Sequence, residues 1–176
     1  EAWSDSVAWL DRIVEHKRGE LVRAKRRMDP AWLRRQAETS TAPRSFAGAL
    51  RTGAAPRIIA EVKKASPSAG VIRADFDPVA IGRIYERHGA DCLSVLTDSH
   101  FFQGKLSYLS AIHDSVQLPL LRKDFILDRY QLLEARNARA DAVLLIAEIL
   151  PGDRLKALFD QASELGLHVL VELHDA

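Results

Sequence analysis

The residues from Arg57 to Ser68 read Arg-Ile-Ile-Ala-Glu-Val-Lys-Lys-Ala-Ser-Pro-Ser and predict a buried strand that ends in charged residues. Because strand side chains alternate between faces, Glu61 and Lys63 should share one face while Val62 points to the other. Opposite charges at the end of an apolar strand are costly to desolvate unless they pair, so they indicate a candidate active site. The alternative is a strand that runs out into solvent with charged residues at its frayed end. The Ser-Pro-Ser turn should end the strand.

The composition is that of an ordinary globular domain. The chain has 176 residues, of which 47% are hydrophobic and 28% charged. A net charge of +1 argues against a nucleic-acid partner, and the basic residues around Lys25 to Arg27 are predicted to form a solvated helix face. No apolar run is long enough to cross a membrane. The only cysteine, Cys92, excludes an internal disulfide and favours the reducing cytoplasm.

The order of sequence patterns predicts one domain over residues 1–176. Residues 1–56 show helical spacing of apolar positions and predict a helical extension. Residues 57–176 predict strands 1 to 5, which begin 23 to 34 residues apart, with helices between them over residues 78–88, 106–116, 128–139 and 152–165. Pro78 and Pro151 are predicted in the first turns of helices, and Gly89 and Gly166 at their ends.

Repeated strand–helix units with nearly continuous apolar strands indicate an α/β protein with a parallel sheet covered by helices. No glycine-rich phosphate loop follows the first strand, which disfavours a Rossmann nucleotide domain. The sequence therefore predicts a (β/α)8 TIM-barrel type of fold, here an incomplete barrel of about five parallel strands.

Ionisable residues stand where the predicted strands end. Glu61 and Lys63 end the first strand, Lys123 the third, and Glu172 lies in the fifth. Since the C-terminal ends of parallel strands meet at the active edge of such a barrel, these side chains should converge. Asp98 and Asp124 either position lysines or cap the helices that follow. The histidines show no spacing typical of metal ligands.

Five motifs of the chain resemble, in order, those of the indole-3-glycerol phosphate synthase family. They are Glu61-Val-Lys63-Lys-Ala-Ser66-Pro67-Ser68, Ser94-Val-Leu-Thr97-Asp98, Phe102-Gln-Gly104, Leu121-Arg-Lys123-Asp124-Phe125-Ile126 and Val171-Glu172. The resemblance covers essentially the whole chain. It implies a lyase of tryptophan biosynthesis that needs no metal or organic cofactor. The family converts 1-(2-carboxyphenylamino)-1-deoxyribulose 5-phosphate to indole-3-glycerol phosphate, with release of carbon dioxide and water.

The chemistry of that reaction suggests a role for each residue. Ring closure needs an acid at the carbonyl oxygen; Lys123 is the candidate, and Glu61 would orient it and favour its charged form. The dehydration needs a base and an acid. The resemblance implies Glu172 as the base and either Lys63 or Lys123 as the acid.

Three further residues are candidates for substrate binding. Phe102 and Phe125 either form an apolar slot for the anthranilate ring or serve as core aromatics. Ser66 either donates to a substrate oxygen or forms the turn.

The number of predicted strands bears on activity. A closed barrel needs eight strands and commonly binds phosphate after the seventh and eighth, so the phosphate-binding residues are expected beyond residue 176. The chain alone is therefore expected to be inactive or nearly so, and to self-associate or pair with a missing C-terminal segment. Two other functions stay open: another phosphate-binding barrel enzyme, such as phosphoribosylanthranilate isomerase, and a non-catalytic fragment of the synthase.

Overall fold

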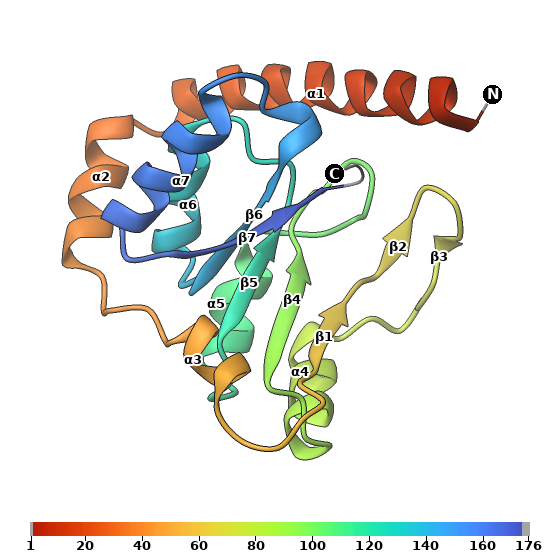
Figure 1. Ribbon diagram of the computed structural model, residues 1–176, viewed down its shortest axis with the longest axis vertical. Coiled ribbons are helices and arrows are strands. Elements are labelled where there is room, and N and C mark those ends of the chain that lie inside the picture. Colours follow the sequence, from red (N-terminus) through yellow and green to blue (C-terminus); the bar gives the residue numbers. More distant parts are fainter. Residues whose placement is uncertain (1, 174–176) are drawn as a thin grey trace.

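A computed structural model describes residues 2–173 and shows helices followed by alternating strands and helices (Figure 1). The first three helices precede every strand: α1 (Ala2–Arg27), α2 (Pro30–Thr39) and α3 (Phe46–Arg51). The elements that follow are β1 (Ile59–Val62), β2 (Ala65–Ser66), β3 (Gly70–Val71), α4 (Pro78–Arg87), β4 (Cys92–Leu96), α5 (Ser107–His113), β5 (Leu120–Lys123), α6 (Arg129–Asn137), β6 (Ala142–Ile146), η1 (Ala147–Ile149), α7 (Arg154–Glu164) and β7 (His168–Glu172).

The five long strands form one parallel sheet in the order β1-β4-β5-β6-β7. This order confirms the predicted α/β architecture, because each strand lies beside the next one along the chain. Over residues 2–173 the sheet does not close, which is the arrangement of an incomplete α/β barrel. One outer edge belongs to β1 and the other to β7 (Figure 1).

Two local expectations were wrong. The first strand was expected to be buried, but only Val62 of β1 is buried and Ile58 is 48% exposed, because β1 is an edge strand. Pro151 precedes α7 by three residues and lies outside its first turn. The Ser-Pro-Ser stretch does turn the chain, since Pro67 and Ser68 lie in the turn between β2 and β3. Pro78 does begin α4, and Gly89 and Gly166 adopt left-handed backbone conformations after helices, as predicted.

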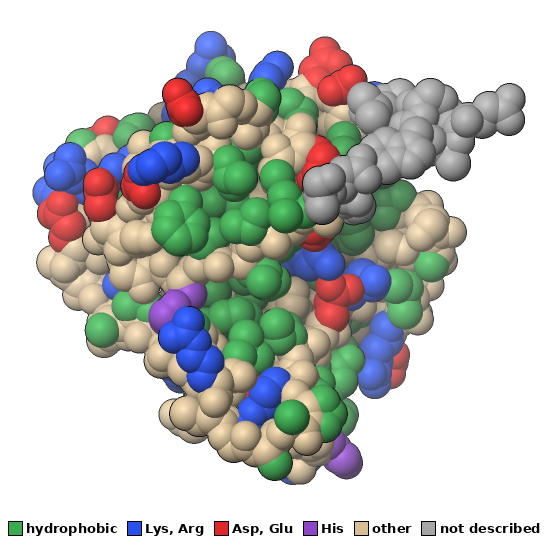
Figure 2. All heavy atoms as spheres, viewed as in Figure 1, with side chains coloured by type: hydrophobic (Ala, Val, Ile, Leu, Met, Phe, Trp, Pro, Cys, Tyr) green, Lys and Arg blue, Asp and Glu red, His purple; other side chains and the backbone are tan. Residues whose placement is uncertain are grey.

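The two faces of the sheet are covered differently. One face packs on helices through buried residues such as Leu93, Val95, Leu120 and Val143. On the other face, here called the open face, Phe46 of α3 packs on a small cluster that contains Cys92, Leu121 and Ala142. Apolar side chains are visible across the middle of the molecule in Figure 2. α3 therefore covers the N-terminal end of the open face, whereas Glu61 and Lys123 toward its C-terminal end are 30% and 37% exposed.

Candidate active site

Glu61 lies between two lysines at the C-terminal end of β1. Its Oε1 accepts from Lys63 Nζ at 3.0 Å, and its Oε2 accepts from Lys123 Nζ at 2.9 Å. Glu61 and Lys63 share a face because they are two residues apart along an extended chain. The second lysine comes from β5, two strands away in the sheet, so the predicted convergence of the first and third strands is present.

The electrostatics of Glu61 follow from this arrangement. Burial by itself would raise the pKa of the Glu61 carboxyl, but the hydrogen bonds from Lys123 and Lys63 outweigh it and hold the pKa below its ordinary value. The side chains of Lys63, Glu61 and Lys123 are 33%, 30% and 37% exposed. A carboxylate that stays charged therefore orients two ammonium groups that a small molecule can still reach.

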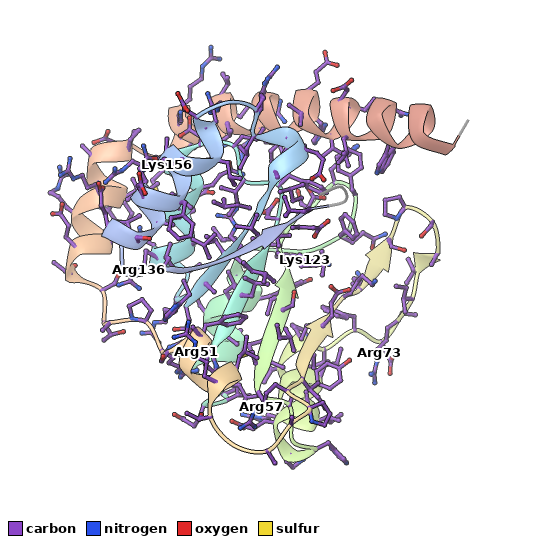
Figure 3. All side chains as sticks on the ribbon, in the orientation of Figure 1. Arg51, Arg57, Arg73, Lys123, Arg136 and Lys156 are labelled. Carbon is purple, nitrogen blue, oxygen red and sulfur yellow. The ribbon has the colours of Figure 1, made fainter. Side chains whose placement is uncertain are left out.

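Lys123 and Glu172 are the last residues of β5 and β7, at the C-terminal end of the parallel sheet. Lys123 is level with Leu96 of β4, and Glu172 is level with Ile146 of β6. Lys123 extends from the sheet near the middle of the view in Figure 3. Glu172 is half-buried at the end of the edge strand β7. The structure thus places all four predicted ionisable residues at the C-terminal end of the sheet.

The predicted binding residues occupy the loops that follow the strands. Phe102 follows β4, Phe125 follows β5, and their ring centroids lie 6.2 Å apart with an angle of 36° between the planes. Both side chains are half-buried, and Phe125 packs against the main hydrophobic cluster. Ser66 lies in the hairpin, where its Oγ accepts from the backbone N–H of Ala69 at 3.1 Å. That bond supports its role in the turn.

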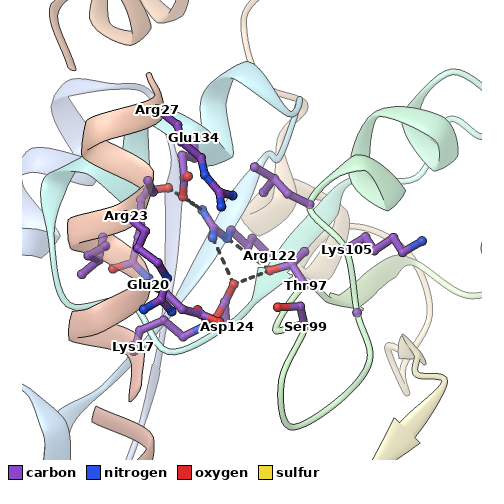
Figure 4. A pocket seen from close by; sticks show the side chains of 15 residues that line it. Lys17, Glu20, Arg23, Arg27, Thr97, Ser99, Lys105, Arg122, Asp124 and Glu134 are labelled. Atoms are coloured by element: carbon purple, nitrogen blue, oxygen red, sulfur yellow. Dashed lines mark hydrogen bonds and ion pairs between the residues drawn. The ribbon is translucent and has the colours of Figure 1, made fainter. Parts of the chain in front are cut away.

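A buried ionic network, which no sequence pattern indicated, joins α1 to the strand ends (Figure 4). Lys17 of α1 is only 4% exposed. Its ammonium lies 2.7 Å from Asp98, 3.0 Å from Asp124 and 2.7 Å from Glu20. Burial opposes the charge on Lys17, but the carboxylates outweigh it and raise the pKa of the ammonium. The helical extension is therefore fastened to the loops after β4 and β5.

Arg122 extends this network toward α6. Its guanidinium lies 3.0 Å from Asp124 and 3.3 Å from Glu134, and its Nε donates to Thr97 Oγ1 at 3.2 Å. Burial would raise the pKa of Asp124, but Arg122 and Lys17 lower it well below the ordinary range. Every charge in this buried group has an opposite partner, which is the condition for keeping charges away from water.

The two roles considered for Asp98 and Asp124 are now separated. Both bind Lys17, so the prediction that they position a lysine is confirmed. Neither caps a helix, because the residues before α5 and α6 are Leu106 and Asp128. Each aspartate accepts from a backbone N–H in its own loop, Asp98 from Phe101 at 2.6 Å and Asp124 from Phe125 at 2.8 Å. They thereby fix the loops that carry Phe102 and Phe125.

Within residues 2–173 no group of three or more His, Cys, Asp or Glu side chains could hold a metal ion. His174 lies outside the described residues. Nor does this part of the chain contain a helix with the length and apolar character needed to cross a membrane.

The family model for indole-3-glycerol phosphate synthase matches residues 10–176. The chain belongs to this family. Among curated proteins, it is 52% identical over 170 residues to an indole-3-glycerol phosphate synthase of Acidithiobacillus ferrooxidans, a match covering 95% of this chain and 65% of the relative. The synthase of Rhodopirellula baltica is 52% identical over 166 residues, covering 94% and 64%. That of Dechloromonas aromatica is 49% identical over 169 residues, again covering 94% and 64%. The chain thus spans about two thirds of the length of these synthases, just under that fraction in each case.

Proposed function

We propose that this chain carries the acid–base groups of an indole-3-glycerol phosphate synthase, a carboxy-lyase of tryptophan biosynthesis. Its substrate is the small phosphorylated molecule 1-(2-carboxyphenylamino)-1-deoxyribulose 5-phosphate. The observation that carries the proposal is the Glu61 carboxylate bound to Lys123 at 2.9 Å and Lys63 at 3.0 Å, at the strand ends of a parallel sheet. Membership of the synthase family supports the same reaction.

In the proposed ring closure, the aromatic carbon that bears the carboxylate attacks the carbonyl carbon of the sugar-derived chain. The Lys123 ammonium gives a proton to the carbonyl oxygen as the new carbon–carbon bond forms. Loss of carbon dioxide then restores the aromatic ring. Glu61 supports this step because it fixes the direction of the Lys123 ammonium before substrate arrives, so little reorganisation remains for the reaction itself.

In the proposed dehydration, the hydroxyl group formed by ring closure leaves as water. Glu172 takes a proton from the intermediate, while Lys63 or Lys123 gives one to the leaving oxygen. The two ammonium groups contact different oxygens of Glu61, so each can act without displacing the other. The half-buried rings of Phe102 and Phe125 provide the proposed slot for the anthranilate ring.

The role of Glu172 predicts a separation of the two steps. A Glu172→Gln variant of a complete enzyme should slow dehydration by about 100-fold while condensation continues, because the base is needed only after carbon dioxide has left. Rapid-quench analysis should then show a decarboxylated intermediate that still contains the hydroxyl group. If product forms with unchanged kinetics, Glu172 has no such role.

We also propose that catalysis needs more strands than the five described here. Among residues 2–173, β1 and β7 each have one unpaired edge, and exposed Leu170 and Val171 on β7 suit pairing with a further segment or with a second copy. Phosphate sites of such barrels commonly follow the seventh and eighth strands. The proposed location of the enzyme is the cytoplasm, where the single thiol of Cys92 would stay reduced.

The test is to assay the purified 176-residue chain for indole-3-glycerol phosphate by its fluorescence, alone and with a polypeptide that supplies the C-terminal third of a relative. We expect little or no turnover alone, together with self-association by light scattering, and turnover of the carboxyphenylamino substrate when the segment is added. Full activity in a monodisperse monomer would contradict the need for further strands. Isomerisation of phosphoribosylanthranilate instead would indicate the alternative enzyme. No turnover of either substrate, with or without the added segment, would indicate a non-catalytic fragment.

A further inference from the structure

An apolar groove of about 510 Å³ lies on the outside of the fold, away from the Glu61 site. The end of α1, the start of α2, and helices α5 and α6 form its walls. The apolar part contains Met28, Trp32, Leu33, Leu106 and the ring of Tyr130. Met28 and Trp32 are 42% and 43% exposed although they adjoin this concave surface. Both the volume and the apolar lining are typical of sites for small organic molecules.

Most polar groups of the groove are already bound within the protein. Tyr130 Oη donates to the carbonyl of Ala24 at 3.0 Å, and Asn137 Nδ2 donates to that of Leu33 at 3.0 Å. Glu134 is engaged by Arg122 at 3.3 Å. These contacts fix the walls and leave few groups to attract a neutral polar ligand.

Arg27 is the exception. It lines the groove, and within the described part of the chain no carboxylate forms an ion pair with its guanidinium. Lys25 and Arg34, nearby in the sequence, are each paired, with Asp128 and Glu38. Arg27 is exposed, as the predicted solvated helix face requires, and its side chain extends from α1 into the space beside Glu134 (Figure 4).

A second cavity of about 490 Å³ continues from the groove, since the two share Ala24, Arg27, Leu106 and Glu134. Two more cations line it, Arg23 and Lys105, and neither forms an ion pair among the described residues. Its lining contains five cations and three carboxylates, which leaves a net charge of +2 at one end of the apolar groove; they are Lys17, Arg23, Arg27, Lys105 and Arg122, and Glu20, Asp124 and Glu134. The groove and its extension complement a ligand that is apolar at one end and anionic at the other.

We propose that this groove binds a small aromatic carboxylate. The ring lies against Trp32 and Leu106, and the carboxylate accepts two parallel hydrogen bonds from the Arg27 guanidinium. A planar guanidinium at the border of an apolar pocket matches a carboxylate in both geometry and charge. The indole of Trp32 offers a flat face for offset stacking. The lining includes none of Glu61, Lys63, Lys123 and Glu172, so the site is independent of the proposed catalytic function.

The experiment titrates naphthalene-2-carboxylate into the 176-residue chain and compares it with the neutral isostere naphthalene-2-carboxamide, by calorimetry at low salt. We expect the carboxylate to bind at least about tenfold more tightly than the amide, as a charge-assisted pair provides. Arg27→Gln should abolish this preference, and Trp32→Ala should weaken both probes. Arg26→Gln is the matched control, because Arg26 directly precedes Arg27 on the same helix and does not line the groove.

Binding of such a probe at the active site is excluded by a further variant. Phe102→Ala should leave the affinity for naphthalene-2-carboxylate unchanged if the probe occupies the groove. Loss of binding in Phe102→Ala, equal affinity for the acid and the amide, or an undiminished preference in Arg27→Gln would each overturn the proposal. Because this assay involves no turnover, an inactive chain would not affect its outcome.

Discussion

Replacing Lys123 by alanine should lower the rate of ring closure by about 100- to 10,000-fold, the range typical for loss of a general acid. The reason lies in the geometry, since Lys123 is held by Glu61 at 2.9 Å and remains 37% exposed toward the open face. The measurement is single-turnover formation of indole-3-glycerol phosphate in a complete enzyme that contains these residues. Such an assay separates chemistry from product release.

The control for Lys123→Ala is Lys156→Ala. Lys156 lies on α7, is exposed, and pairs with Asp160 on the same helix, so its removal should leave turnover unchanged. Circular dichroism should show the same fold for both variants. Near-normal turnover in Lys123→Ala would reject Lys123 as the acid and leave Lys63 as the candidate, since Lys63 binds the other oxygen of Glu61.

Local periodicity was enough to predict most of the elements that build this site. Strand alternation alone places Glu61 and Lys63 on one face, and their ion pair at 3.0 Å agrees with that expectation. The meeting of Glu61 with Lys123 was predictable because parallel strands present their C-terminal ends at one edge of the sheet. These features depend on spacing within a strand or on the common direction of strands, and a single sequence contains both.

The features that were missed depend on contacts between distant parts of the chain. The exposure of Ile58 follows from β1 being an edge strand, which its apolar composition does not indicate. Lys17 and Asp98 are 81 residues apart, and in sequence Lys17 looks like any other charged residue of a helix. The only signal was the pair of aspartates after the second and third predicted strands, for which a lysine partner was considered. No local pattern identified which lysine it would be.

Lys17 also provides the prediction with the largest expected effect on stability. Lys17→Met removes the ammonium from between Asp98 and Asp124, which are 0% and 5% exposed. Breaking a buried ionic group by removing one partner leaves uncompensated charge, so the free energy of unfolding should fall by about 3 to 5 kcal/mol. Urea denaturation followed by far-ultraviolet circular dichroism measures this change, as a lower midpoint with a similar slope.

A surface ion pair of the same length is the control for Lys17→Met. Lys25 lies two turns further along α1 and binds Asp128 at 2.7 Å, but the two side chains are 41% and 33% exposed. Lys25→Met should therefore cost at most about 1 kcal/mol. Equal losses in the two variants would contradict the view that burial makes the Lys17 group important.

The effect of Lys17→Met should also depend on pH in a definite direction. In the native protein Lys17 helps to lower the pKa of Asp124, so the resulting stability is present above the ordinary carboxyl pKa and is lost as pH falls through the lowered value. Without the ammonium, the pKa of Asp124 rises and the carboxyl becomes protonated at a higher pH. The difference in stability between native protein and variant should thus be greatest near neutral pH and decrease below about pH 4. A difference that stays constant from pH 7 to pH 3 would mean that packing of the lysine stem, rather than its charge, fastens α1 to the strand ends.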